Sequence, residues 1–170
     1  MSKTVTFIIL LALFLSNQGN TFAAENQLLE IKSEAAVLLD SETGAILYNK
    51  NGDERLYPAS LTKIATAIYA IEKGNLDDLV TVSANAVKEE GTRVYLVEGE
   101  KVPLKKLIQG MLINSGNDAA MAIAEHLDGS VEEFADHINR YLAEKIGVSG
   151  THFTNPNGLY NENHYTTAID

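Results

Sequence analysis

The chain has 170 residues, enough for one domain with a hydrophobic core and too few for two. It carries 13 basic and 23 acidic residues, and its net charge of −10 argues against charge-driven binding to nucleic acid or anionic lipid. The absence of cysteine excludes disulfides, thiolate metal sites and a cysteine nucleophile.

The first residues are typical of a secretory signal peptide. Lys3 precedes an apolar run over residues 7–15, and small residues follow up to Ala23. A membrane anchor normally needs about 20 apolar residues, more than this run offers. We therefore expect residues 1–23 to be removed on export, which leaves a net charge of −11 because only Lys3 among them is charged. The mature protein, from residue 24, would lie outside the cytoplasm.

A hairpin is predicted first. The runs 35–40 and 45–48 are β-compatible, and residues 41–44 join them with Gly44 serving the turn. A helix follows, which Pro58 can open and which Gly74 ends. This helix has a wide apolar face, made of Leu61, Ile64, Ala65, Ile68 and Ile71.

The middle of the chain predicts a short strand and then helices. Residues 80–82 are compatible with a strand, Ser83 can cap a short helix, and residues 91–99 form a loop or extended piece. Apolar residues then recur at the helical period, at Leu104, Leu107, Ile108, Met111 and Leu112.

Two further helices and a loop complete the chain. After a turn at residues 114–117, a helix rich in small residues runs to Gly129, with Ala120, Ile123, Ala124 and Leu127 facing inward. Ser130 resembles a capping residue that opens a third helix. Residues 151–163 are predicted to be loop.

Ser60 and Lys63 stand one helical turn apart and can share a helix face. A serine hydroxyl is a poor nucleophile at neutral pH unless a base removes its proton. A lysine amine can be that base if burial lowers its pKa. The alternative is a helix start with an exposed lysine, and the pair alone does not decide between them.

A tight turn between two helices would present a second hydroxyl and an amide, those of Ser115 and Asn117, into a cleft, with Gly116 permitting the unusual backbone conformation. The alternative is an ordinary helix end followed by a cap. Ser83 and Asn85 repeat the same spacing, but capping explains Ser83 fully.

No metal site or cofactor is expected. The histidines lack the helical spacing of metal ligands, so we interpret them as surface or capping groups: His126, His137, His152 and His164.

Four motifs make the chain resemble a known family. They are residues 59–63 (ASLTK), 81–86 (TVSANA), 112–120 (LINSGNDAA) and 151–159 (THFTNPNGL). With them the chain resembles the serine D-alanyl-D-alanine carboxypeptidases, low-molecular-mass penicillin-binding proteins of the peptidase S11 family. The similarity runs from about residue 35 to the end and is greatest to members tied to spore-cortex peptidoglycan.

The resemblance implies a penicillin-recognising α/β (α+β) fold, a sheet flanked by helices, with a helical region over about residues 75–145. The family's third motif, Lys-Thr-Gly, normally on an inner strand, is absent; residues 42–44 (ETG) lie in the first hairpin and do not replace it. We therefore interpret residues 24–170 as the N-terminal part of the catalytic domain, and expect this part alone to be inactive.

The resemblance also implies a mechanism and partners. Ser60 would attack the carbonyl between the terminal D-alanines of a peptidoglycan stem peptide, Lys63 would accept its proton, Ser115 would relay a proton to the departing D-alanine, and Asn117 would orient substrate and lysine. β-Lactams would be covalent inhibitors. No cofactor or nucleic acid is implied, and membrane association would require a further C-terminal tail.

Two alternatives remain open from the sequence. A serine β-lactamase shares S-x-x-K but needs a glutamate to activate the deacylating water, and residues 162–164 do not match that loop. A peptidoglycan-binding or β-lactam-sensing module could keep the cleft without turnover.

Overall fold

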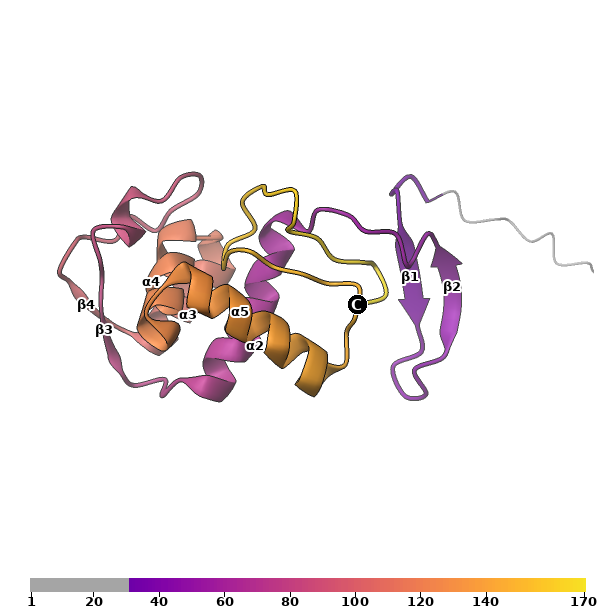
Figure 1. Ribbon diagram of the computed structural model, residues 1–170, viewed down its shortest axis with the longest axis horizontal. Coiled ribbons are helices and arrows are strands. Elements are labelled where there is room, and N and C mark those ends of the chain that lie inside the picture. Colours follow the sequence, from indigo (N-terminus) through magenta and orange to yellow (C-terminus); the bar gives the residue numbers. More distant parts are fainter. Residues whose placement is uncertain (1–30) are drawn as a thin grey trace, which may run out of the picture. The chain divides into compact units, whose positions relative to one another are not determined.

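The computed structural model describes residues 31–170 (Figure 1). The expected signal peptide, residues 1–23, lies outside this range. Within the described range, no helix is both long and apolar enough to cross a lipid bilayer. In chain order the elements are β1 (Ala36–Leu39), β2 (Ile46–Lys50), η1 (Ala59–Leu61), α2 (Thr62–Lys73), β3 (Leu79–Thr81), η2 (Ala86–Lys88), β4 (Lys101–Pro103), α3 (Leu104–Asn114), α4 (Asn117–Asp128), α5 (Val131–Tyr141) and η3 (Leu142–Ile146).

The first hairpin forms as predicted. β1 and β2 pair antiparallel, with Ala36 opposite Lys50. Gly44 in the turn has a φ of +71°, which glycine adopts far more readily than other residues. The Asp40 carboxylate accepts the backbone N–H of Thr43 at 2.8 Å, so side-chain hydrogen bonding also stabilises the turn.

A second two-stranded sheet joins β3, which the sequence predicts, to β4, which it does not. The strands pair antiparallel with Val80 opposite Val102. A strand of three residues, one of them a lysine and one a proline, is too short to show an alternating apolar pattern. Only its pairing with β3 in the structure identifies β4 as a strand. Ser83 accepts the N–H of Ala86 at 3.0 Å, which confirms its predicted role as a cap.

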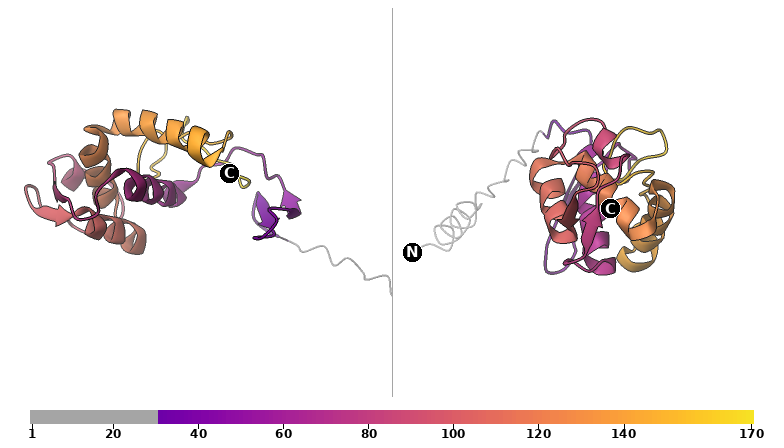
Figure 2. Two further views of the ribbon diagram at one scale, coloured as in Figure 1. Left: turned by 90° about the horizontal axis from the view of Figure 1, so that it is seen from below. Right: turned by 90° about the vertical axis from the view of Figure 1, so that its left-hand side faces the viewer.

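Helices α2, α3 and α4 lie against one another (Figure 2). Apolar side chains from all three form one buried cluster between them. The apolar residues of α3 that recur at the helical period are buried, apart from Leu112, which is 48% exposed. Gly129 ends α4 as predicted, with a φ of +85°.

Helix α5 forms a second cluster against α2. Ser130 accepts the N–H of Glu133 at 3.1 Å, so the predicted cap is confirmed. Phe134 and Ile138 are fully buried, and the ring of Tyr69 on α2 meets Phe134 edge-on with centroids 5.5 Å apart.

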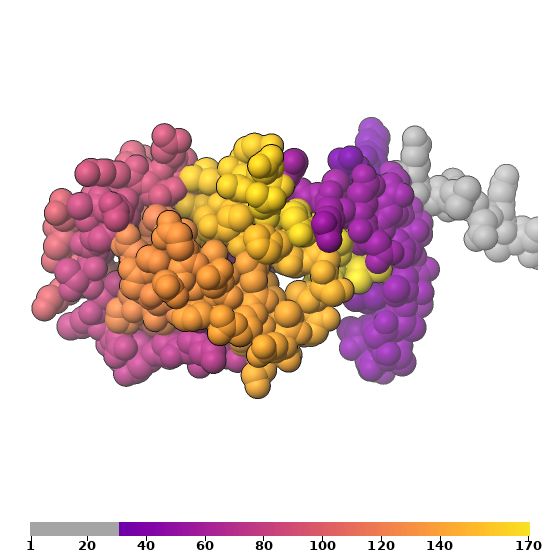
Figure 3. Space-filling model, viewed as in Figure 1, coloured from indigo at the N-terminus to yellow at the C-terminus, as the bar shows by residue number. Residues whose placement is uncertain are grey.

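The C-terminal segment, residues 151–170, returns to the start of the helical region. Leu56 and Thr166 form an isolated antiparallel bridge, in which the N–H of Leu56 donates to the carbonyl of Thr166 at 2.8 Å. Asn139 on α5 donates to the carbonyl of Phe153 at 2.7 Å, and the space-filling view shows this segment, in yellow, packed onto α5 (Figure 3).

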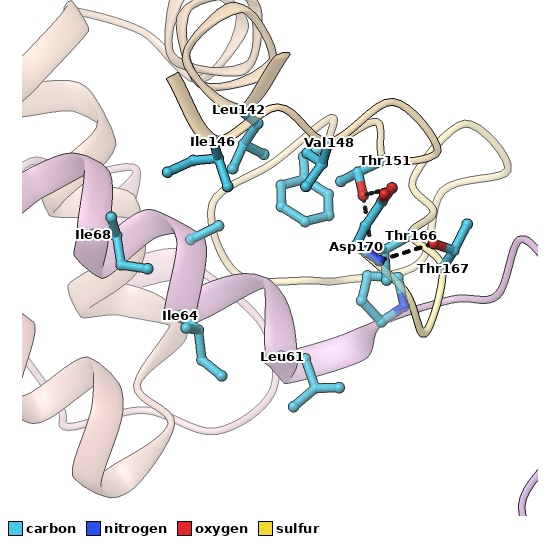
Figure 4. Close-up of a pocket in the computed structure, with 13 residues that line it drawn as sticks. Leu61, Ile64, Ile68, Leu142, Ile146, Val148, Thr151, Thr166, Thr167 and Asp170 are labelled. Carbon is cyan, nitrogen blue, oxygen red and sulfur yellow. Dashed lines mark hydrogen bonds between the residues drawn. The ribbon is translucent and has the colours of Figure 1, made fainter. Parts of the chain in front are cut away.

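The buried and exposed faces of α2 are the reverse of what its apolar pattern indicates. Leu61 is 66% exposed, Ile64 54% and Ile68 42%. These side chains line a groove of about 280 Å³, whose lining also includes Leu142, Ile146 and Val148 (Figure 4). An amphipathic helix normally turns its apolar stripe to the core.

The polar stripe of α2 is buried because another segment satisfies its hydrogen bonds. The Thr66 hydroxyl donates to the carbonyl of Pro156 at 2.8 Å, and the Lys63 amine donates to that of Asn157 at 2.7 Å. Buried polar groups are stable only with such partners. The 154–158 loop supplies them from residues far away in the sequence.

Candidate active site

Ser60 lies in the 3₁₀ turn η1 just before α2, at a solvent-exposed position. The sequence predicts Ser60 within the helix that Pro58 opens; in the structure the regular α-helix begins two residues later, at Thr62. Ala59, immediately before Ser60, has a φ of +48°. The hydroxyl is therefore presented by a tight, uncommon turn at the N-terminal end of α2.

Lys63 and Ser60 meet as the spacing predicts. The Lys63 Nζ lies 3.2 Å from the Ser60 Oγ. The lysine side chain is buried, at 2% exposure, and burial lowers its pKa from the ordinary value. Within residues 31–170, no carboxylate forms a salt bridge with Lys63. These surroundings favour a neutral amine, which is the form that can accept a proton.

Ser115 comes to the same point from a different element. It ends α3, and its Oγ lies 3.0 Å from the Ser60 Oγ. Ser115 itself has a positive φ, +57°, whereas Gly116 has an ordinary φ of −63°. The expectation that Gly116 supplies the unusual backbone conformation is therefore wrong. A Cβ at Gly116 would lie 3.0 Å from a methyl carbon of Val94, so the valine side chain would have to shift by a few tenths of an ångström to admit it.

Asn117 begins α4 and is buried at 6% exposure. Its Nδ2 donates to the carbonyl of Glu90 at 2.7 Å, and its backbone N–H donates to that of Thr92, also at 2.7 Å. In the described part of the chain no hydrogen bond joins it to Lys63. Asn117 therefore holds the backbone of residues 90–92, and its contact with substrate stays a prediction.

The three close groups form one hydrogen-bonding circuit. The Ser115 hydroxyl donates to Ser60, and with a neutral amine the Ser60 hydroxyl can donate in turn to Lys63. A pocket of about 440 Å³ opens beside them, lined from η1, α2 and α3 by Pro58, Ala59, Ser60, Leu61, Lys63, Ile64, Met111, Leu112 and Ser115. This arrangement can activate a serine for nucleophilic attack on a carbonyl.

The comparisons with known proteins agree with this chemistry. The family model Peptidase_S11, D-alanyl-D-alanine carboxypeptidase, matches residues 20–170. This chain belongs to the peptidase S11 family.

Curated relatives of this S11 chain are named D-alanyl-D-alanine carboxypeptidases. DacF of Bacillus subtilis is 42% identical over 144 residues, which cover 82% of this chain and 37% of DacF. DacA of Haemophilus influenzae is 34% identical over an alignment covering all of this chain and 46% of DacA. The chain thus spans less than half the length of these relatives.

Solved structures of the family share the fold. The carboxypeptidase DacD from Francisella tularensis matches with a TM-score of 0.77 and 41% identity, over 83% of this chain and 35% of DacD. Penicillin-binding protein 5 from Haemophilus influenzae matches with a TM-score of 0.76 and 35% identity, over 82% of this chain and 43% of that one. The S11 chain therefore has the α/β fold of these penicillin-binding peptidases over the matched region.

The expectation that all four histidines are surface or capping groups is wrong for one of them. His164 is 2% exposed and lies 2.8 Å from the hydroxyl of Thr62. The 151–159 motif marks the neighbouring loop in the sequence. It does not predict that this part of the chain contacts α2. Within residues 31–170, no cluster of potential metal ligands forms.

Proposed function

We propose that the full-length protein is a serine D-alanyl-D-alanine carboxypeptidase that removes the terminal D-alanine from peptidoglycan stem peptides. The observation that carries the proposal is the Ser115–Ser60–Lys63 circuit, in which a buried lysine lies 3.2 Å from an exposed serine hydroxyl. The names and conserved fold of the S11 relatives support the choice of substrate.

Acylation begins with proton transfer from the Ser60 hydroxyl to the neutral Lys63 amine. The Ser60 oxygen forms a bond to the carbonyl carbon between the two D-alanines, which becomes tetrahedral. When the carbon–nitrogen bond breaks, the leaving nitrogen takes a proton through Ser115, and Lys63 returns to its neutral form. The products are free D-alanine and an ester on Ser60.

Deacylation transfers the acyl group to water. A water molecule gives a proton to the Lys63 side of the circuit and attacks the ester carbonyl, and the Ser60 oxygen leaves as it regains a proton. Asn117, two residues after Ser115 at the start of α4, is the proposed substrate-binding residue. A β-lactam would acylate Ser60 by the same first step, with its ring amide in place of the peptide bond.

The compartment follows from this substrate. Stem peptides of peptidoglycan lie outside the cytoplasmic membrane, so the protein must be exported, as the expected signal peptide over residues 1–23 would provide. Membrane association after export would depend on a C-terminal tail.

The test compares the full-length wild type with Ser60→Ala, Ser115→Ala and, as a control, Ser83→Ala. Ser83 repeats the S-x-N spacing but caps η2 instead of meeting Ser60. We expect a fluorescent penicillin to label wild type and Ser83→Ala, to label Ser115→Ala about 10²-fold more slowly, and not to label Ser60→Ala. Release of D-alanine from a D-Ala-D-Ala peptide should follow the same order.

The alternatives predict different results. A serine β-lactamase would hydrolyse nitrocefin rapidly and release little D-alanine. A binding module would show no covalent adduct in any variant. Either pattern, in protein shown to be folded, would contradict the carboxypeptidase assignment.

A further inference from the structure

The turn that presents Ser60 is held in a conformation its sequence does not favour. Ala59, immediately before the nucleophile, has a φ of +48°, in the left-handed region. For a residue other than glycine this conformation is unfavourable, and it persists only when the surroundings impose it. The position of the Ser60 hydroxyl therefore depends on whatever restrains Ala59.

Two contacts converge on the Ala59 carbonyl oxygen. The Thr62 hydroxyl donates to it at 2.9 Å. Gly158 packs so closely that a Cβ at that position would lie 1.8 Å from the same oxygen. One restraint comes from the helix and the other from the C-terminal segment.

His164 connects these two elements. Its Nε2 lies 2.8 Å from the Thr62 hydroxyl, and its Nδ1 accepts the backbone N–H of Thr154 at 3.0 Å. A backbone N–H can only donate, so the proton of the neutral imidazole is on Nε2. Nε2–H then donates to Thr62, whose own proton is directed to the Ala59 carbonyl. Each donor in this chain has one acceptor.

No solvent is available to replace these contacts. His164 is 2% exposed and Thr62 is fully buried. The imidazole is also stacked on the ring of Phe153, with centroids 4.9 Å apart, which fixes the direction of both ring nitrogens. Removing the imidazole would leave the Thr62 oxygen without a donor, and a buried hydroxyl that loses its partner can turn away from its former geometry.

We propose that His164 is a positioning residue for the nucleophile, acting through the Thr62 hydroxyl to hold the Ala59–Ser60 turn where Ser60 reaches Lys63 and Ser115. It does not touch the reacting atoms. The inference rests on the proposed function, because it concerns the rate at which Ser60 is acylated.

The experiment uses the full-length protein with His164→Leu, Thr62→Val and the double variant, and measures the acylation rate constant with a fluorescent penicillin and kcat and KM with a D-Ala-D-Ala peptide. A displaced nucleophile should slow acylation and lower kcat by about 10- to 100-fold with little change in KM. Because both residues act through one chain of hydrogen bonds, the double variant should be no slower than the slower single variant.

Two conservative variants separate positioning from a loss of folding. Thr62→Ser keeps the hydroxyl, and His164→Gln keeps one donor and one acceptor, so both should acylate within about threefold of wild type. Thr66→Val is the matched control: it removes an equally buried hydroxyl one turn further along α2, bonded to Pro156. It should lower the melting temperature while slowing acylation less than Thr62→Val does.

Several outcomes would overturn the proposal. They are acylation by folded Thr62→Val or His164→Leu within twofold of wild type, fully additive losses in the double variant, and a loss in Thr66→Val as large as that in Thr62→Val. If the wild type itself is not acylated at Ser60, the proposed function fails instead. If the wild type is acylated at Ser60, the proposed function stands, and the variants then test only the role of His164.

Discussion

The Lys63 Nζ lies 2.7 Å from the carbonyl oxygen of Asn157, ninety-four positions later in the chain. This carbonyl accepts one N–H of the amine, whether the amine is charged or neutral, without adding a negative charge. Burial therefore lowers the pKa of Lys63. A carboxylate in the same place would stabilise the charged amine and oppose this effect. The contact holds the buried amine of Lys63 in place, as its proposed role as a base requires.

Lys63→Arg should abolish acylation in practice, with a loss of about 10²- to 10⁴-fold, because a guanidinium cannot act as a base near neutral pH. In the wild type, the acylation rate should rise with pH as the amine deprotonates, with a midpoint below the ordinary lysine pKa of 10.5. Acylation by a fluorescent penicillin, measured against pH in the wild type and in Lys63→Arg, checks both expectations. A midpoint at or above 10.5 would contradict a general-base role for this buried amine.

Gly158→Ala should destabilise the fold by more than about 2 kcal/mol, because the new Cβ would collide with backbone as well as require a positive φ. Gly158 has a φ of +86°, and the Cβ would lie 1.8 Å from the Ala59 oxygen. Gly44→Ala is the control, since Gly44 has a φ of +71° and open space around its Cβ position. Urea unfolding should show a loss of only about 1 kcal/mol there. Equal losses would mean that the backbone angle, and not the collision, dominates.

Stability should fall as the pH drops from about 6.5 to about 4 because of His164. Burial, and secondarily the charge of His152, lowers the pKa of His164 from 6.5 to about 4. The unfolded chain then binds a proton that the folded protein does not, so unfolding becomes more favourable, by up to about 3 kcal/mol below pH 4. Above about 6.5 both states are neutral and the effect vanishes.

Unfolding measured against pH in wild type and His164→Gln checks this effect, since the glutamine does not titrate. The difference in free energy of unfolding between the two proteins should change over this pH range. A constant difference would show that His164 is not the group responsible.

The exposed apolar face of α2 should bind a hydrophobic dye in the 170-residue chain. Leu61, Ile64 and Ile68 lie along one groove and are each more than 40% exposed. Ile64→Ser and Ile68→Ser should reduce the fluorescence of bound anilinonaphthalene sulfonate. Ile113→Ser on α3, 80% exposed and not part of that groove, is the control. An equally large fall in fluorescence with Ile113→Ser would mean that the dye binds exposed apolar side chains in general and not this groove.

Local chemistry in the sequence determined most elements and the contact between Ser60 and Lys63, the two main residues of the proposed site. Turn and capping residues such as Gly44 and Ser130 act on neighbouring backbone, so their effects could be read from the sequence and are confirmed. The 3.2 Å contact between Ser60 and Lys63 likewise follows from one helical turn.

Only the tertiary structure decided which face of α2 is buried and what surrounds Ser60. The apolar pattern indicates burial of Ile64, yet it is exposed, because the loop around Asn157 supplies hydrogen bonds to the polar face instead. His164 and Ser115 reach the Ser60 turn from distant segments. Such contacts depend on how loops pack across the chain, and no periodicity or spacing within one segment encodes them.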